Sequence, residues 1–374
     1  MLPPHRYAQG ELTAVFAEVV AGDAHSEQGA RLHPLIARLH GNSGVSQRYL
    51  ARPLEWYRTF AGFTDANAAF VETALDLGAD AVTQALSQAG LTPRDVDLLV
   101  SATVTGLAVP SLDARIAARL EMRTDVKRVP LVGLGCVAGA AGIARVHDYL
   151  LGHPGEVAVL VATELCSLTL QRDDTSTANL VASGLFGDGA AAVVLIGPEH
   201  PAAQRDSAAQ RDPEAEGDLG IERDPATTPQ PQVLATRSRL YPETERAMGW
   251  DVGQSGLRIV LGVEVPDLVR TQVRADVDGF LEARGLTRAD IGWWVAHPGG
   301  PKVLEALAEA LAVEREALQV TWDSLDRIGN LSSASVLHVL ADTLRERPPA
   351  AGSLGILLAM GPGFCLELVL LQAG

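Results

Sequence analysis

The chain has 374 residues, of which 47% are hydrophobic, and a formal net charge of −16 at pH 7. This length and apolar content predict a globular protein with one large or two medium domains. The negative charge argues against nucleic acid or an anionic membrane as the main partner. Because no apolar run approaches the ~18 residues of a membrane span and no signal peptide is visible, we expect a cytoplasmic protein without a membrane span.

The number and spacing of the cysteines also favour a cytoplasmic protein. The three cysteines, Cys136, Cys166 and Cys365, are widely separated and odd in number. They form neither a disulfide framework nor a metal-ligand cluster, so we expect a reducing compartment and no bound metal. Thiol chemistry remains open to them.

The N-terminal part of the chain alternates predicted helices and strands. It starts abruptly at Met1-Leu-Pro-Pro4, with no apolar strand before these residues. Apolar periodicity predicts a helix over 11–21, a long helix over 65–89 and a strand over 98–103.

Residues 34–60 are rich in basic and aromatic side chains, although the protein is acidic as a whole. They include Arg38, His40 and Arg48. Two interpretations stay open for this segment, a solvated helix face and an anion-binding mouth.

Residues 129–150 predict a short buried strand, a glycine turn and a helix that opens on Cys136. The free N–H groups and the positive dipole end of a helix favour an anion, so we expect the Cys136 thiol to be pushed toward thiolate. The following run of alanines and glycines would let another backbone pack closely. The alternative is a buried, inert cysteine.

Three segments of the first half return in the same order in the second half. Gly90-Leu-Thr-Pro-Arg-Asp, which precedes a strand, matches Gly285-Leu-Thr-Arg-Ala-Asp 195 residues later. Such collinear matches indicate a duplicated β/α unit. The two further matches pair the strand, turn and helix around Cys136 with residues 320–340, and the strand 157–163 with 354–360.

The repeat predicts an α/β fold in which two halves, residues 1–198 and 233–374, pack against each other. The strands are apolar throughout, which is typical of sheets buried on both faces. Between the halves, residues 199–232 contain a near repeat rich in Ala, Arg, Asp and Pro. We expect this segment to be a disordered surface insertion.

The duplication brings together three residues that are far apart in sequence. The helices near Cys136 and Asn330 should lie side by side, and His297 ends the strand equivalent to 98–103. A cysteine nucleophile, a histidine beside it and an amide donor suit acyl transfer through a thioester and an oxyanion. Taken singly, His297 could be a turn residue and Asn330 only a helix N-cap.

These residues lie in motifs that resemble the thiolase-fold condensing enzymes, and within them the type III polyketide synthases of the chalcone synthase kind. The resemblance covers nearly the whole chain outside 199–232. It implies a layered αβαβα fold, a homodimer, and no cofactor besides the acyl-CoA and malonyl-CoA substrates. The motifs are Gly133-Leu-Gly-Cys136-Val-Ala-Gly, Gly184-Leu-Phe186-Gly-Asp-Gly-Ala, Ala296-His297-Pro-Gly-Gly-Pro, Gly329-Asn330-Leu-Ser-Ser-Ala and Gly361-Pro-Gly363.

The resemblance also implies roles for single residues. Cys136 would accept the acyl group, while His297 and Asn330 would hold the malonyl thioester carbonyl during decarboxylation. Phe186 would separate the coenzyme A tunnel from the cavity, and Arg38 would contact the coenzyme A phosphates. Further cavity residues are Val104, Val109, Thr169, Ala182, Ser332 and Ile259, of which Val109 would reach across the dimer and Ile259 replaces a usual phenylalanine.

The sequence around the cysteine looks most like actinobacterial alkylresorcinol and alkylpyrone synthases. We therefore predict a medium- or long-chain fatty acyl-CoA starter, iterative condensation with malonyl-CoA, and closure to a pyrone or resorcinol, since aliphatic walls suit an alkyl chain. The alternatives are a ketoacyl synthase III-type enzyme with one condensation and a non-catalytic acyl-CoA-binding homologue.

Overall fold

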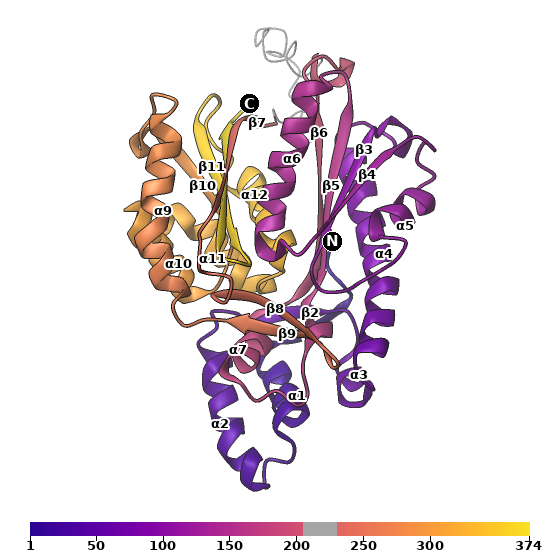
Figure 1. Cartoon of the computed structure of the whole chain (residues 1–374), viewed down its shortest axis with the longest axis vertical. Coiled ribbons are helices and arrows are strands. Elements are labelled where there is room, and N and C mark those ends of the chain that lie inside the picture. The colour runs from indigo at the N-terminus through magenta and orange to yellow at the C-terminus, as the bar shows by residue number, and fades with distance from the viewer. Residues whose placement is uncertain (205–229) are drawn as a thin grey trace, which may run out of the picture.

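The structure is a computed structural model that describes residues 1–204 and 230–374 (Figure 1). Two four-stranded sheets form its centre, with strand orders β4-β3-β5-β6 and β10-β11-β12-β7. The first sheet consists of β3 (Leu98–Thr103), β4 (Lys127–Val132), β5 (Val157–Leu165) and β6 (Asp188–Ile196). The second consists of β7 (Gln232–Leu240), β10 (Ile291–Ala296), β11 (Leu354–Gly361) and β12 (Cys365–Gln372).

Helices cover both outer faces of the sheets and fill the space between them (Figure 1). The first sheet is covered by α4 (Phe63–Gln88) and α5 (Leu112–Arg119), and the second by α9 (Val265–Glu282) and α10 (Pro301–Leu311). Between the sheets lie α6 (Ala138–Gly152) and α12 (Ser335–Glu346). This arrangement confirms the predicted αβαβα layers.

The remaining elements gather at one end of these layers, at the bottom of Figure 1. They are the strand pair β1 (His5–Ala8) and β2 (Gln47–Leu50), the hairpin β8 (Met248–Gly253) and β9 (Gly256–Leu261), and the helices α1 (Gln9–Ala21), α2 (Glu27–Gly41), α3 (Leu54–Thr59) and α7 (Thr177–Leu185).

The two central helices touch because glycines on α6 leave room for their neighbours. A Cβ on Gly139 would come within 2.3 Å of the Ser333 carbonyl oxygen. A Cβ on Gly142 would come within 2.5 Å of the Leu160 side chain on β5. The close approach predicted from the small residues after Cys136 is therefore present.

The internal repeat is visible in matching local structures. Thr92 and Thr287 each precede a short 3-10 turn that leads into β3 or β10. In each turn the backbone N–H of the threonine donates to the carboxylate of the aspartate three residues later, Asp95 or Asp290. One predicted strand is wrong, because residues 319–328 form the helix α11 (Gln319–Ile328). Its buried side chains recur at helical spacing, so the segment places an apolar stripe against the core.

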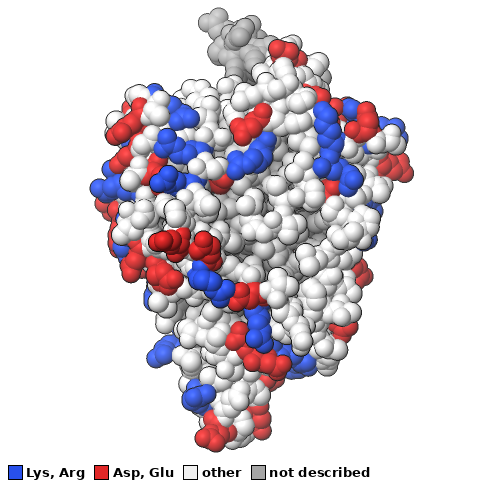
Figure 2. All heavy atoms as spheres, viewed as in Figure 1, with Lys and Arg blue, Asp and Glu red and all other residues white. Residues whose placement is uncertain are grey.

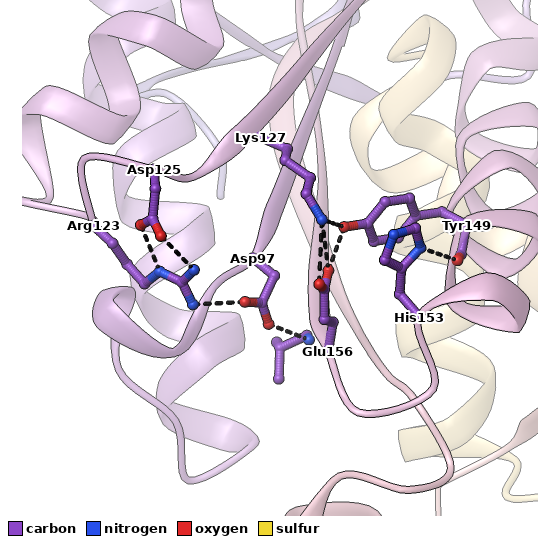
Figure 3. Close-up of polar contacts among 8 residues, drawn as sticks. Asp97, Arg123, Asp125, Lys127, Tyr149, His153 and Glu156 are labelled. Atoms are coloured by element: carbon purple, nitrogen blue, oxygen red, sulfur yellow. Dashed lines mark hydrogen bonds and ion pairs between the residues drawn. The ribbon is translucent and has the colours of Figure 1, made fainter.

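The strand before Cys136 was expected to be buried, yet β4 is an exposed edge strand. It pairs only with β3, and Val129 and Val132 are 42% and 59% exposed. Charged residues gather at its start, where Lys127 meets Glu156 and, nearby, Arg123 meets Asp97 (Figure 3). Such partly exposed ion pairs contribute little to stability. They lie at the start of the strand, and the apolar side chains of Val129 and Val132 face outward.

The first residue lies at the other edge of the same sheet. The Met1 amino group donates to the Ala190 carbonyl on β6 at 2.6 Å, and the Ala190 N–H donates to the Met1 carbonyl at 2.9 Å. In the second half, β7 runs along the full corresponding edge of β12.

The predicted insertion at 199–232 lies mostly outside the described residues. Among the residues that the structure does describe, no helix is long and apolar enough to cross a bilayer.

Candidate active site

Cys136 lies in a 3-10 turn, Gly135–Val137, directly before α6. Gly135 has a φ of +53°, and a Cβ there would come within 2.7 Å of the Pro362 side chain. Glycine is therefore required for the turn to lie on the loop after β11. The Cys136 Sγ makes one weak contact, a 3.6 Å hydrogen bond to the Ser332 hydroxyl.

Asn330 follows the end of α11 and forms a bridge with Phe186. Its N–H donates to the Leu185 carbonyl at 3.0 Å, and its carbonyl accepts from the Gly187 N–H at 3.0 Å. The side-chain Oδ1 accepts from the Ser332 N–H at 2.8 Å, the hydrogen bond of an Asx turn. Since Oδ1 is used in this way, the amide nitrogen of Asn330 is the group left to donate.

His297 follows β10 and is 3% exposed. Its backbone N–H donates to the Leu358 carbonyl on the neighbouring β11 at 3.0 Å. The buried ring atom Nδ1 has no hydrogen-bond partner among the described residues. A buried polar atom without a partner is costly, so it indicates a group that a ligand can satisfy.

Burial controls the charge of the cysteine and the histidine. It raises the pKa of Cys136 to about 12 and lowers the pKa of His297 to about 3. Desolvation therefore favours the neutral thiol and the neutral imidazole over the charged pair, against the expected resting thiolate. The hydrogen bond with Ser332 lowers the pKa of Cys136, but by less than desolvation raises it.

A buried carboxyl group, Glu164, lies beside Cys136 and was missed from the sequence. It accepts hydrogen bonds from the Thr105 hydroxyl at 2.8 Å, the Val104 N–H at 3.1 Å and the Ser333 hydroxyl at 2.5 Å. Burial raises the pKa of Glu164, and its charge is one of the influences that raise the pKa of Cys136. The signal in the sequence was a glutamate near the end of an otherwise apolar strand.

A pocket lies between α7, β2 and the β8–β9 hairpin, and its volume of about 360 Å³ includes space open to solvent. Four predicted residues, Thr169, Ala182, Phe186 and Ile259, are in its wall, and so is Cys166. Sequence reasoning missed Arg48 and Trp250 as wall residues. The complete lining is Phe16, Arg48, Cys166, Ser167, Thr169, Leu170, Asn179, Ala182, Ser183, Phe186, Trp250 and Ile259.

The other predicted cavity residues lie elsewhere. Ser332 contacts Cys136, and Val104 lies near Gly135 in the same turn region. Val109 is 96% exposed on the surface of the single chain. Cys365 is half-buried and donates to the Pro362 carbonyl at 3.4 Å.

A second cavity of about 290 Å³ shares Thr169 and Leu170 with the first. Its wall is mainly apolar and includes Phe60, Phe63 and Leu257.

The basic segment 34–60 does not form an anion-binding mouth as a whole. His40 and Arg48 are buried, while Arg52 and Arg58 form ion pairs with Glu72 and Glu18. Arg38, the residue predicted to contact the coenzyme A phosphates, is exposed in the last turn of α2. On the face drawn in Figure 2, basic and acidic side chains are interspersed.

Known proteins share this fold and much of this sequence. Two sequence profiles match the chain, "FAE1/Type III polyketide synthase-like protein" over residues 13–210 and "Chalcone and stilbene synthases, C-terminal domain" over 232–373. A 1,3,6,8-tetrahydroxynaphthalene synthase from Streptomyces peucetius is 51% identical over 99% of this chain and 90% of its own length. A putative chalcone synthase from Bacillus subtilis is 32% identical over 88% of this chain and 86% of its own.

The likeness extends to solved structures. The crystal structure of 1,3,6,8-tetrahydroxynaphthalene synthase from Streptomyces coelicolor matches with a TM-score of 0.86 at 27% identity, covering 100% of this chain and 97% of that one. The fold and the family matches define a thiolase-like condensing enzyme. The chain belongs to the type III polyketide synthases, which are acyltransferases that condense acyl-CoA and malonyl-CoA substrates without a separate cofactor.

Proposed function

We propose that this enzyme builds its product from malonyl-CoA units alone and closes it to a polyhydroxylated aromatic ring system. The observation that carries the proposal is the 51% identity, over 99% of the chain, to a 1,3,6,8-tetrahydroxynaphthalene synthase. In such a product the oxygens alternate around the fused rings, so malonyl-derived units account for the whole skeleton. No carbon is left for a long acyl starter.

The wall of the larger cavity supports a polar chain. Its side chains include Arg48, Ser167, Asn179 and Ser183 beside the aromatic Trp250. An alkyl chain gains about 0.8 kcal/mol per methylene only where it leaves water for apolar surroundings. A chain with an oxygen on every second carbon suits this mixed wall better.

In the proposed reaction, Cys136 takes the acyl group from coenzyme A. The Sγ–acyl bond forms as the sulfur–acyl bond of coenzyme A breaks. The thiol proton passes to the neutral imidazole of His297 and from there to the departing coenzyme A sulfur, which leaves as the free thiol. His297 and the Asn330 amide nitrogen then donate hydrogen bonds to the malonyl thioester carbonyl while carbon dioxide leaves. The resulting enolate carbon attacks the acyl-Cys136 carbonyl and frees the thiolate.

The roles of the two donors have a direct test. His297→Gln and Asn330→Ala should each lower the rate of malonyl-CoA decarboxylation by about 10²- to 10³-fold, the usual effect of removing an oxyanion donor. The rate is measured as acetyl-CoA formed by the folded variants. Wild-type decarboxylation in either variant would contradict its role.

A fatty acyl-CoA starter, with closure to an alkylresorcinol or alkylpyrone, is the second candidate. The apolar wall of the second cavity, with Phe60, Phe63 and Leu257, favours it. If the two cavities join at Thr169 and Leu170, together they would hold an alkyl tail. Ile259→Phe should then shorten the longest starter that the enzyme accepts.

Product analysis distinguishes the candidates. The wild-type enzyme is incubated with isotope-labelled malonyl-CoA, alone and with unlabelled acyl-CoA esters of increasing length, and the products are identified by mass spectrometry. We expect a fully labelled aromatic product from malonyl-CoA alone. Products that form only with an added ester and carry its unlabelled chain would favour the second candidate, and a single condensation would favour a ketoacyl synthase III-type reaction.

The proposal includes a homodimer formed through the β4 edge. Val129 and Val132 on this strand are exposed apolar residues, and so is Val109 in the connection between β3 and α5. An unpaired strand edge with apolar side chains favours association with another chain. Val132→Lys should shift the sedimentation of the protein toward the monomer, whereas an unchanged mass would argue against this interface.

A further inference from the structure

We propose that Arg48 is the recognition residue for a carboxylate or enolate oxygen of the acyl chain inside the cavity beside Phe186. This inference rests on the proposed function, because a malonyl-primed chain carries such oxygens and a fatty acyl chain does not. It concerns a residue of β2 that the sequence offered only as part of a basic segment.

The guanidinium of Arg48 is only partly satisfied by the protein. Nε donates to Oε1 of Gln9 at 3.0 Å, and Nη1 donates to the Phe186 carbonyl at 2.7 Å. Nη2, which carries two N–H groups, is buried and has no partner among the described residues. The side chain is 1% exposed, so bulk water does not solvate this donor.

No carboxylate neutralises Arg48 directly. Asp188 is near enough to raise the pKa of Arg48, but its oxygens accept from the Ala51 N–H at 2.6 Å and the Ser167 N–H at 2.8 Å. Burial lowers the pKa of Arg48 to about 10, which leaves the guanidinium charged at neutral pH. The cavity wall therefore contains a buried cation with a free pair of donors.

The other polar side chains of the wall donate within the protein. The Thr169 hydroxyl donates to the Cys166 carbonyl at 2.8 Å, the Asn179 amide to the Gln171 carbonyl at 3.0 Å, and the Ser183 hydroxyl to the Leu180 carbonyl at 3.0 Å. Among the buried polar side-chain atoms of this wall, Nη2 of Arg48 is thus the one without a partner in the described part of the chain. An arginine fork matches the geometry of a carboxylate and binds it strongly.

A structural role explains only part of the residue. The Arg48 stem fills the space beside Gly329, where a Cβ would come within 3.2 Å of its Cγ and Cδ. With the bond to Phe186, this contact supports the bridge that carries Asn330. The guanidinium also lies over the Phe16 ring, with Cζ 5.6 Å from its centroid. None of these contacts gives Nη2 a hydrogen bond.

The first test measures starter choice. Malonyl-CoA competes with hexanoyl-CoA, and the ratio of kcat/KM for the two starters is obtained from the products. Arg48→Lys should lower the preference for the malonyl starter about tenfold or more, because a site built to bind a polar group loses its discrimination when the donor is removed. The matched control is Gln9→Met, which removes the acceptor of Nε and keeps Nη2 free.

The control should keep the wild-type preference. An equal loss in both variants would overturn the inference by assigning the effect to packing, and an unchanged preference in Arg48→Lys would overturn it as well. The wild-type enzyme separates this result from the proposed function. If it makes no product from malonyl-CoA alone, the proposed function fails before the variants are compared.

A second measurement does not depend on the folding of an Arg48 variant. Cys136→Ala is titrated calorimetrically with succinyl-CoA and with butyryl-CoA, which have equal chain lengths and the same coenzyme A phosphates. The terminal carboxylate of succinyl-CoA should strengthen binding about tenfold. Equal or tighter binding of butyryl-CoA would overturn the inference and would leave the coenzyme A phosphates as the anions that the protein recognises.

Discussion

The two halves of the protein meet at the active site with the same backbone and different side chains. The 3-10 turns before α6 and α12 start 197 residues apart, as do β5 and β11, so Cys136 corresponds to Ser333 and Glu164 to Gly361. Where the second turn meets β5, the Ser333 hydroxyl donates a hydrogen bond to Glu164. Where the first turn meets β11, the turn of Cys136 packs on Gly361, which has no side chain.

This difference shows how a symmetric frame produces an asymmetric site. The Ser333 and Glu164 pair ties one turn to one strand with a buried hydrogen bond. The Cys136 and Gly361 pair leaves the thiol with a single weak contact, which keeps it available for an acyl group. The N-terminal half therefore contributes Cys136 and Glu164, and the C-terminal half contributes the Ser333 and Gly361 that face them.

Making the two turns chemically alike should have the largest effect. In Cys136→Ser both halves carry a serine at this position, and a neutral hydroxyl is a much weaker nucleophile than a thiol. Polyketide formation should fall by about 10³-fold or more, while malonyl-CoA decarboxylation continues. Product formation near the wild-type rate would refute the nucleophile, and Cys365→Ser serves as the control.

Adding a side chain at the bare glycine should have the next largest effect. In Gly361→Ala the new Cβ would come within 2.7 Å of the Leu134 carbonyl oxygen and 2.8 Å of the Val137 Cβ, so the turn of Cys136 must shift. Misplacement of the nucleophile should slow acyl loading about 10²-fold. Acyl-enzyme formation is measured by mass spectrometry.

Gly155→Ala is the matched control for Gly361→Ala, because a Cβ on Gly155 meets nothing within 4 Å. Decarboxylation should persist in Gly361→Ala, since its donors lie outside the displaced turn. Unimpaired loading would mean that the glycine does not control the position of the thiol.

The charge of the thiol gives a smaller and graded effect. With a pKa of about 12, Cys136 is almost fully protonated near neutrality, and its thiolate fraction grows with pH. Alkylation by iodoacetamide should therefore accelerate about tenfold per pH unit from roughly pH 7 to 10 without a plateau. A plateau near neutral pH, after subtraction of the Cys136→Ser background, would indicate a resting ion pair with His297 instead.

Removing the Ser333 hydroxyl, which donates to Glu164, should have the smallest effect on the reaction rate. Ser333→Ala deprives Glu164 of a buried donor, which should lower the free energy of unfolding by about 1–3 kcal/mol. Thermal unfolding measures the change against Ser111→Ala, whose hydroxyl caps no helix N–H. Equal melting temperatures would show that the hydrogen bond between Ser333 and Glu164 does not stabilise the fold.

Local patterns carried most of the predicted fold. The caps at Thr92 and Thr287 and the apolar strands after them depend on neighbours in sequence, so the duplication was visible without a structure. The helix α11 was mistaken for a strand, because its apolar residues fit either period over so short a length.

Long-range burial explains what could not be predicted at the site. Arg48 and Glu164 are charged residues whose burial depends on partners such as Phe186 and Ser333, far away in sequence. The resting charge of Cys136 was wrong for the same reason, because the helix end was visible in the sequence and the depth of burial was not.

The bridge between Phe186 and Asn330 has a practical consequence for redesigning the product. Phe186 in the cavity wall and Asn330 belong to one hydrogen-bonded bridge. Arg48 also holds this bridge, because its Nη1 donates to the Phe186 carbonyl. Substitutions at Phe186 should therefore also move the amide that we propose for decarboxylation. Ile259 and Trp250 pair on a separate hairpin, so substitutions there should change the pocket wall without moving Asn330.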